Sequence, residues 1–262
     1  MKARSSSLPT EVVAVLESTL AGARDLLRER FVGMYLYGSL ATGDFTPERS
    51  DIDFLVVTDA ELPEVIVAAL AEMHARFAAS GEPWFSHLEG SYIPRADMRR
   101  YDPKTARHPH LSVGEALRIE QHGADSVIQR WVLREQGVVL AGPEPRTFID
   151  PVTPSELRAA IVELLRGFWA RQLVDDDFLA PREYQVFAVL TLCRALNTLE
   201  SGAMLSKPAA ARWAIEMLDE PWPAIVQRAL AWPHGDQADG LEEARALIRH
   251  ALERANRGRL ER

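Results

Sequence analysis

Residues 37–44 read YGSLATGD and residues 50–57 read SDIDFLVV, and these two stretches decide how the first half of the chain folds. The apolar run 32–36 leads into the first stretch, and the apolar run 54–57 ends the second, so each stretch adjoins a predicted buried strand. The segment between the two strands is rich in glycine, threonine, serine and proline, which predicts a loop. We therefore expect a strand, a loop and a second strand, with polar side chains at the junctions.

These junctions carry residues that together suit a metal ion and a phosphate. Gly38 and Ser39 follow the first strand, where a glycine lets backbone N–H groups and a hydroxyl approach an anion closely. Asp51 and Asp53 stand at positions i and i+2 of an extended segment, so both carboxylates project from one face, about 6 to 7 Å apart. Such carboxylates repel each other unless a cation lies between them, and Mg²⁺ prefers oxygen ligands. Each half alone is an ordinary turn or a polar strand start, but the combination favours a functional site.

A third carboxylate is expected from a neighbouring strand, because two metal ions that bridge a phosphoryl transfer need more than two anionic ligands. Glu89 is the candidate, since it lies on the next apolar segment, Trp84–Ile93, which has strand composition. Glu82 is the alternative. Glu89 could also be an ordinary solvated residue near the end of a strand.

The remainder of the first 150 residues alternates between helical and strand patterns. Helical spacing predicts helices over 8–31, 62–79 and 124–135, with Thr10 as the N-cap of the first, and residues 137–141 predict a short strand. Residues 94–115 are punctuated by prolines and predict a long surface loop. The His108-Pro109-His110 sequence has no carboxylate or cysteine at fixed spacing and is interpreted as part of that loop, not as a metal pair.

After Pro154 the pattern changes to helices alone. Helical periodicity covers residues 155–173, 183–200, 208–218, 222–232 and 241–257, with no convincing strand between them. We therefore predict an α+β fold: an α/β domain with a mixed sheet over residues 1–150, and an α-helical bundle over residues 151–262.

Composition narrows the class of partner. The 262 residues include 30 Lys and Arg against 38 Asp and Glu, a net charge of −8, and no basic cluster is present, so nucleic acid is not an expected partner. A small, cationic or polyhydroxylated ligand fits better. The single cysteine, Cys193, excludes an intrachain disulfide, and no run of about 18 apolar residues suggests a membrane span. We expect a cytoplasmic monomer that does not associate with membranes.

The Gly-Ser, spacer and Asp-x-Asp pattern resembles the nucleotidyltransferase fold of the DNA polymerase β superfamily. The whole chain is similar to the aminoglycoside (3″)(9) adenylyltransferases, two-domain enzymes that transfer AMP from ATP to streptomycin and spectinomycin. The similarity is strongest at the Gly-Ser and Asp-x-Asp blocks and is thinner elsewhere. The residues that carry it are 36–39, 50–53, Glu89, 140–143, 150–152, 190–194, Lys207, Trp213 and Ala214.

This resemblance implies how a nucleotide would be held in the first domain. Ser39 and Ser50, with the backbone of the Gly38 loop, would contact the phosphates of ATP. Asp51 and Asp53 would bind Mg²⁺, with two ions expected. The first domain is therefore expected to carry the nucleotidyltransferase chemistry, with ATP as the co-substrate.

The same resemblance assigns roles to Glu89 and to two cationic residues of the second domain. Glu89 would be the general base or would complete the metal site, while Arg194 and Lys207 would reach across to the triphosphate from the helical domain. The chain has only three lysines, Lys2, Lys104 and Lys207, among its 30 basic residues, so a lysine at this position could reflect a need for a compact point charge.

The positions that hold the acceptor are less well preserved. Ala116 stands where family members have a tryptophan, Tyr184-Gln185 replaces an acidic pair, and Trp232 replaces a tyrosine that reaches the phosphates. Residues 175–177, all aspartate, could supply acidic contacts to a cationic sugar, although an exposed acidic turn is the simpler interpretation. A protein, tRNA or nucleotide acceptor, and a nucleotide-binding protein without catalytic activity, remain alternatives.

Overall fold

The structure is a computed structural model that describes residues 8–47, 50–175, 177–232 and 239–257. The chain divides into two compact units, one ending at Pro151 and the other beginning at Val152. Within the described residues, no helix combines the length and the apolar character that crossing a bilayer requires.

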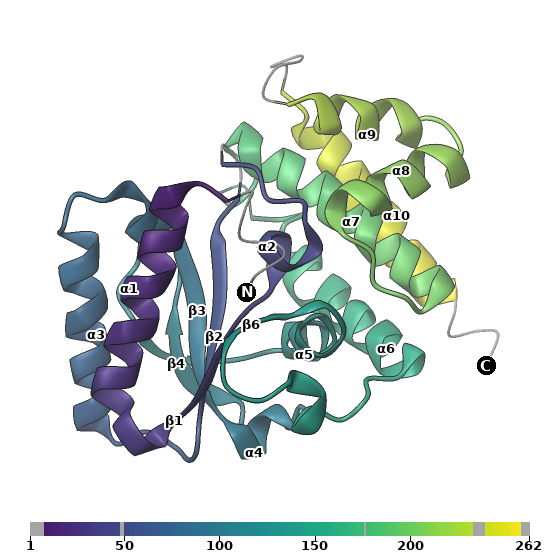
Figure 1. Cartoon of the computed structure of the whole chain (residues 1–262). Helices are drawn as coiled ribbons and strands as arrows, with labels where there is room; N and C mark the ends of the chain where they lie inside the picture. Colours follow the sequence, from purple (N-terminus) through teal and green to yellow (C-terminus); the bar gives the residue numbers. More distant parts are fainter. Residues whose placement is uncertain (1–7, 48–49, 176, 233–238, 258–262) are drawn as a thin grey trace. The chain divides into compact units, whose positions relative to one another are not determined.

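The first unit is built on a mixed sheet of six strands in the order β5-β4-β3-β2-β1-β6 (Figure 1). Only β2 and β3 run parallel, and the other neighbouring strands are antiparallel. The strands are β1 (Phe31–Leu36), β2 (Ile52–Thr58), β3 (Leu88–Pro94), β4 (Arg107–Leu111), β5 (Arg118–Gln121) and β6 (Val138–Ala141).

Alternate residues of β2 serve two different cores. Ile52, Phe54 and Val56 pack on the face covered by helices α1 (Thr10–Leu27) and α3 (Glu64–Ala78). Leu55 and Val57 pack on the opposite face, in a second core with residues of β1, β3 and α5 (Asp125–Gln136). Because side chains alternate along a strand, Asp53 projects to the α5 side, at the end of the β2 strand where the apolar core stops.

Short helical segments connect these elements. Residues after β1 form α2 (Gly38–Thr42), where the sequence predicts only a loop. The others are η2 (Arg28–Arg30), η3 (Pro83–His87), α4 (Arg95–Met98) and η4 (Pro145–Thr147).

Several sequence-based boundaries were wrong. Pro9, not Thr10, is the N-cap of α1, and its carbonyl accepts a hydrogen bond from the Val13 N–H at 3.2 Å. The strand expected from Trp84 begins at Leu88, because residues 83–87 form the 3₁₀ turn η3.

Residues 94–115 are not one long loop: they include α4 and β4. His108, Pro109 and His110 all lie on β4, which pairs with β3 on one side and β5 on the other. Strand β4 pairs with β3 through His110 and Leu111. Pro109 has no N–H to donate, and it is not part of this pairing. Tertiary pairing here outweighs a local sequence that reads as a loop.

All the regular secondary structure among the described residues of the second unit is helical. Its elements are α6 (Pro154–Leu164), the π-helical turn η5 (Leu165–Trp169), α7 (Arg182–Ser201), α8 (Lys207–Met217), α9 (Trp222–Ala231) and α10 (Leu241–Arg257). Helix α6 starts with a capping box: the Thr153 hydroxyl accepts the Glu156 N–H, and the Glu156 carboxylate accepts the Thr153 N–H. The predicted α+β class, with a mixed sheet followed by a helical region, is confirmed.

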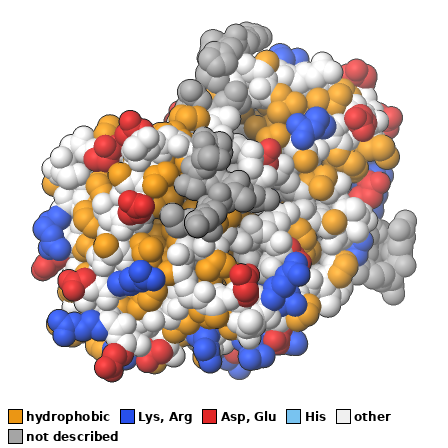
Figure 2. Space-filling view, viewed as in Figure 1, with side chains coloured by type: hydrophobic (Ala, Val, Ile, Leu, Met, Phe, Trp, Pro, Cys, Tyr) orange, Lys and Arg blue, Asp and Glu red, His pale blue; other side chains and the backbone are white. Residues whose placement is uncertain are grey.

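On the face of the molecule seen in Figure 2, acidic and basic side chains are interspersed among hydrophobic ones. This mixed pattern accords with the modest net charge of −8 spread over 262 residues.

Candidate active site

The Gly-Ser loop and the Asp-x-Asp strand are in direct contact. The Tyr37 N–H donates a hydrogen bond of 3.2 Å to the backbone carbonyl of Asp53. Gly38 has a φ of +60°, and a Cβ atom at this position would overlap the Asp53 carboxylate. Only glycine allows both this backbone conformation and this close approach. The two motifs that the sequence separates therefore form one site.

The parallel pairing of β2 with β3 brings the predicted carboxylates together. Asp53 is the register partner of Glu89 on the neighbouring strand, and adjacent strands lie about 4.8 Å apart. Asp51 lies just before β2 and beside His87, with 3.5 Å between Oδ1 and Nδ1. Glu82, the alternative to Glu89, instead caps η3 and accepts a hydrogen bond of 3.3 Å from the Trp84 N–H.

Tyr37 lies against the same carboxylates. Its pKa is raised well above 10.0, mainly because burial disfavours the phenolate and additionally because of the negative charges of Asp53 and Glu89. A hydrogen bond from the Gln129 side chain on α5 opposes this rise in part. The Tyr37 hydroxyl is therefore a neutral group at the acidic end of the sheet.

The two serines present hydroxyl groups that suit a phosphate. The Ser39 Oγ is buried and has no hydrogen-bond partner among the described residues. An unsatisfied buried hydroxyl is costly unless a ligand completes it. The Ser50 Oγ accepts a hydrogen bond of 3.0 Å from the Thr46 N–H, which leaves its own O–H available as a donor.

The carboxylates fit a magnesium ion that arrives with a nucleotide. Among the described residues, no group of three histidine, cysteine, aspartate or glutamate side chains is close enough to hold a metal ion by itself. Mg²⁺ usually binds through one or two carboxylates together with substrate phosphates and water. Asp51 and Asp53, with Glu89 beside them, supply hard oxygen donors of the kind that this binding mode needs.

The cationic residues predicted to contact the triphosphate lie in the helical unit. Lys207 is the first residue of α8, and its Nζ lies 4.1 Å from the centroid of the Phe187 ring on α7. Phe187, Thr191 and Arg194 follow one another at helical spacing and so share one face of α7. The Thr191 Oγ1 is buried and, within the described residues, has no hydrogen-bond partner. This face therefore combines an aromatic ring, an unsatisfied hydroxyl and two cations.

The three positions that align with acceptor-binding residues of the family differ in their exposure and in their hydrogen bonds. Ala116 and Tyr184 are exposed. Gln185 is buried, and its amide is used within the unit: Nε2 donates to the Leu179 carbonyl at 3.1 Å, and Oε1 accepts the Gly240 N–H at 2.9 Å. Gln185 therefore has a structural role and does not replace an acidic contact.

Two other positions noted in the sequence belong to the helical unit. Trp232 is half-buried, and its Nε1 has no hydrogen-bond partner in the described part of the chain. In the acidic run 175–177, residue 176 lies outside the described residues.

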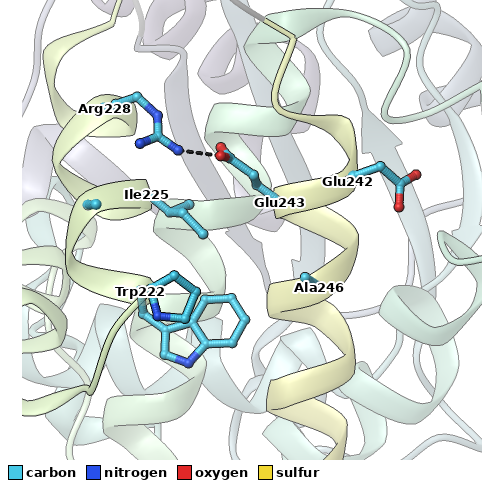
Figure 3. Close-up of a pocket in the computed structure, with 8 residues that line it drawn as sticks. Trp222, Ile225, Arg228, Glu242, Glu243 and Ala246 are labelled. Carbon is cyan, nitrogen blue, oxygen red and sulfur yellow. Dashed lines mark hydrogen bonds and ion pairs between the residues drawn. The ribbon is translucent and has the colours of Figure 1, made fainter.

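A separate hollow lies between α9 and α10 in the helical unit, with a volume of about 410 Å³ (Figure 3). Trp222 and Ile225 contribute apolar walls, and the ion pair between Arg228 and Glu243 lies at its border. It contains none of the site residues predicted from the sequence.

Sequence reasoning assigned no role to His87 or Thr191. It did place His87 on the same face as Glu89, because residues two apart in a strand share a face. Thr191 is three residues before Arg194, which in a helix puts both on one face. In each case the spacing was a usable signal.

The chain matches known families over most of its length. Residues 20–102 match the family described as a nucleotidyltransferase domain, and residues 147–257 match the C-terminal domain of aminoglycoside adenylyltransferases. Among curated relatives, an aminoglycoside (3″)(9) adenylyltransferase of Rhizobium radiobacter is 30% identical over 233 residues, which cover 81% of each chain. A spectinomycin 9-adenylyltransferase of Campylobacter jejuni is 28% identical, over 92% of this chain and 91% of the relative.

A solved structure shares the fold. It is a spectinomycin adenyltransferase from Enterococcus faecialis crystallised with ATP and spectinomycin, with a TM-score of 0.73, 17% identity, and coverage of 93% of this chain and 99% of that one. With both halves of the chain matched and the two relatives aligned over 81% and 91% of their lengths, the protein is an adenylyltransferase and belongs to the aminoglycoside (3″)(9) adenylyltransferase family.

Proposed function

We propose that this enzyme transfers AMP from ATP to a hydroxyl of a small cationic or polyhydroxylated acceptor, of which streptomycin and spectinomycin are the leading candidates, and releases pyrophosphate. The reaction requires Mg²⁺ in this proposal. The observation that carries it is the pairing of Asp53 with Glu89 on adjacent parallel strands, with Gly38 packed directly against the Asp53 carboxylate.

The first unit binds the reacting part of ATP. The Ser39 and Ser50 hydroxyls and the backbone of the Gly38 loop donate hydrogen bonds to phosphate oxygens. Asp51 and Asp53 would hold the magnesium, and Glu89 would supply a further carboxylate if a second ion binds. When bound, Mg²⁺ neutralises phosphate charge and makes the α-phosphorus more electrophilic.

Glu89 serves as the general base. It accepts the proton of the acceptor hydroxyl as that oxygen forms a bond to the α-phosphorus, while the bond from the α-phosphorus to the pyrophosphate oxygen breaks. Arg194 and Lys207 stabilise the negative charge that develops on the departing pyrophosphate. The atoms balance: the products are the adenylylated acceptor, pyrophosphate and a proton.

The acceptor class is supported by the relatives, whose names specify spectinomycin or aminoglycosides. Streptomycin carries guanidinium groups and spectinomycin carries amines, so both are cations that suit an acidic protein. The exposed ring of Tyr184 offers an apolar face on which a sugar ring can lie.

An acceptor screen tests this function. The purified protein is incubated with ATP labelled at the α-phosphate and Mg²⁺, and with streptomycin, spectinomycin, a mixed tRNA preparation or no acceptor. We expect label transfer and pyrophosphate release with at least one of the two antibiotics, and neither with tRNA nor without an acceptor. Transfer to tRNA or to the protein itself would replace the acceptor assignment, and no pyrophosphate release with any acceptor would refute catalysis.

A further inference from the structure

We propose that His87 is a positioning residue for the metal ligand Asp51, through the contact of its Nδ1 with the Asp51 carboxylate, 3.5 Å from Oδ1. This inference rests on the proposed function, because Asp51 matters as a ligand only if the enzyme uses magnesium with ATP. It assigns a role to a residue that the Gly-Ser and Asp-x-Asp motif does not include.

Two pairs of residues follow one another at this end of β2 and β3. Asp53 and Glu89 are cross-strand partners on β2 and β3. Two residues earlier on each chain segment, Asp51 and His87 are in contact, with 3.5 Å between Oδ1 and Nδ1. His87 is thus the nitrogen-bearing member of the two pairs, and the other three members are carboxylates.

His87 is held in place by its neighbours. It ends η3, a turn fixed by the hydrogen bond of 2.6 Å from the Ser86 hydroxyl to the Pro83 carbonyl. The Trp84 ring lies against the imidazole, with 5.2 Å between the ring centroids. The Phe45 ring in turn packs against Trp84, with 5.8 Å between their centroids. Although 44% of the His87 side chain is exposed, the ring has a defined environment.

A positioning role suits this imidazole better than direct ligation. Imidazole nitrogens favour zinc, copper and nickel, whereas magnesium favours oxygen. A carboxylate that binds a metal is commonly oriented by a hydrogen bond from a second residue, and loss of that residue typically costs about 10- to 100-fold in metal affinity or activity. Donation from Nδ1 to Oδ1 leaves the Asp51 Oδ2 to face the ion.

The test compares His87→Ala, His87→Asn and His87→Gln in the full-length protein. The Asn amide places an N–H near the position of Nδ1, whereas the Gln amide places it near Nε2. ATP binding without acceptor is measured by calorimetry, once with Mg²⁺ and once with a chelator, and the ratio of the two Kd values gives the benefit that magnesium provides. Thermal unfolding of each variant checks that it is folded.

We expect His87→Ala and His87→Gln to reduce the magnesium benefit about 10-fold, with chelated ATP binding unchanged, and His87→Asn to stay close to wild type. In AMP transfer, His87→Ala should raise the Mg²⁺ concentration needed for half-maximal rate while kcat at saturating Mg²⁺ changes little.

Three results would overturn the proposal: equal or tighter magnesium-dependent binding by His87→Ala, a defect in His87→Asn as large as in His87→Ala, or full rescue by His87→Gln. If the wild-type protein binds ATP equally with and without Mg²⁺, the proposed function itself fails and this role fails with it. A wild-type response to Mg²⁺ with an unaffected His87→Ala variant overturns only the role of His87.

Discussion

At Gly38 the backbone turns with a φ of +60° directly against the Asp53 carboxylate, so any side chain there must displace a proposed metal ligand. Gly43, on the same loop, has a φ of +82° but open space around its Cα, which makes it a matched control. Alanine at Gly43 should cost about 1 to 2 kcal/mol of unfolding free energy, because the position requires a left-handed backbone, and alanine at Gly38 should cost more, because it also overlaps the Asp53 carboxylate. Only Gly38→Ala should also abolish AMP transfer.

Urea unfolding and AMP-transfer assays on the two variants check this. If Gly43→Ala loses transfer as severely as Gly38→Ala, the strain of the loop, and not the contact with Asp53, is responsible.

Among the residues that the structure describes, the buried Ser39 hydroxyl has no hydrogen-bond partner, so its removal separates binding from stability. Ser39→Ala should leave the unfolding temperature unchanged or slightly higher, because no hydrogen bond within the described residues is lost. It should raise the KM for ATP by about 10- to 100-fold, the effect of losing a hydrogen bond to a charged phosphate. An unchanged KM would remove Ser39 from the phosphate site.

At the scale of elements, α7 and α8 meet where Lys207 lies over the Phe187 ring. This cation–π contact positions the ammonium group proposed to neutralise pyrophosphate. Phe187→Leu should therefore raise the KM for ATP about 2- to 5-fold, corresponding to about 0.5 to 1 kcal/mol, while Phe187→Tyr keeps the aromatic face and should match wild type. Steady-state kinetics check this, and equal KM values for both variants would show that the ring does not act through Lys207.

The elements also show what sequence could and could not predict. The alternation in residues 50–57 was enough to place Asp51 and Asp53 on one face, because that face is set by the period of the strand. It could not supply the register that puts Glu89 beside Asp53, which depends on pairing between segments about 35 residues apart in sequence. Strand β4 was missed because residues 107–111 contain proline and histidine, and their extended form is stabilised by β3 and β5.

At the scale of the whole molecule, buried histidines make stability depend on pH. Burial lowers the pKa of His74 to about 4, and His74 also shares a hydrogen bond of 2.8 Å with the Tyr92 hydroxyl. Burial likewise lowers the pKa of His108 to about 4. In the unfolded chain both titrate near 6.5, so between about pH 6.5 and 4 the unfolded state binds more protons than the folded state.

Each of these histidines should therefore reduce the free energy of unfolding by about 1.4 kcal/mol per pH unit as the pH falls through this interval. Urea unfolding at pH 7.5, 6.0 and 5.0 measures how the free energy of unfolding depends on pH. His108→Gln removes one titrating group, so it should lower this dependence by about 1.4 kcal/mol per pH unit. A free energy of unfolding that is constant from pH 7.5 to 5.0 would contradict the burial of these neutral rings.

The acidic end of the sheet is the proposed site of magnesium-dependent adenylyl transfer, and Asp53→Asn tests this proposal most directly. AMP transfer from α-labelled ATP to the acceptor found for the wild type is measured over a range of Mg²⁺ concentrations, with thermal unfolding recorded in parallel. We predict that Asp53→Asn lowers kcat at least about 1,000-fold, equivalent to about 4 kcal/mol, and leaves the protein folded. A folded Asp53→Asn variant that transfers AMP at a rate near that of the wild type, or wild-type transfer that persists after divalent ions are chelated, would contradict it.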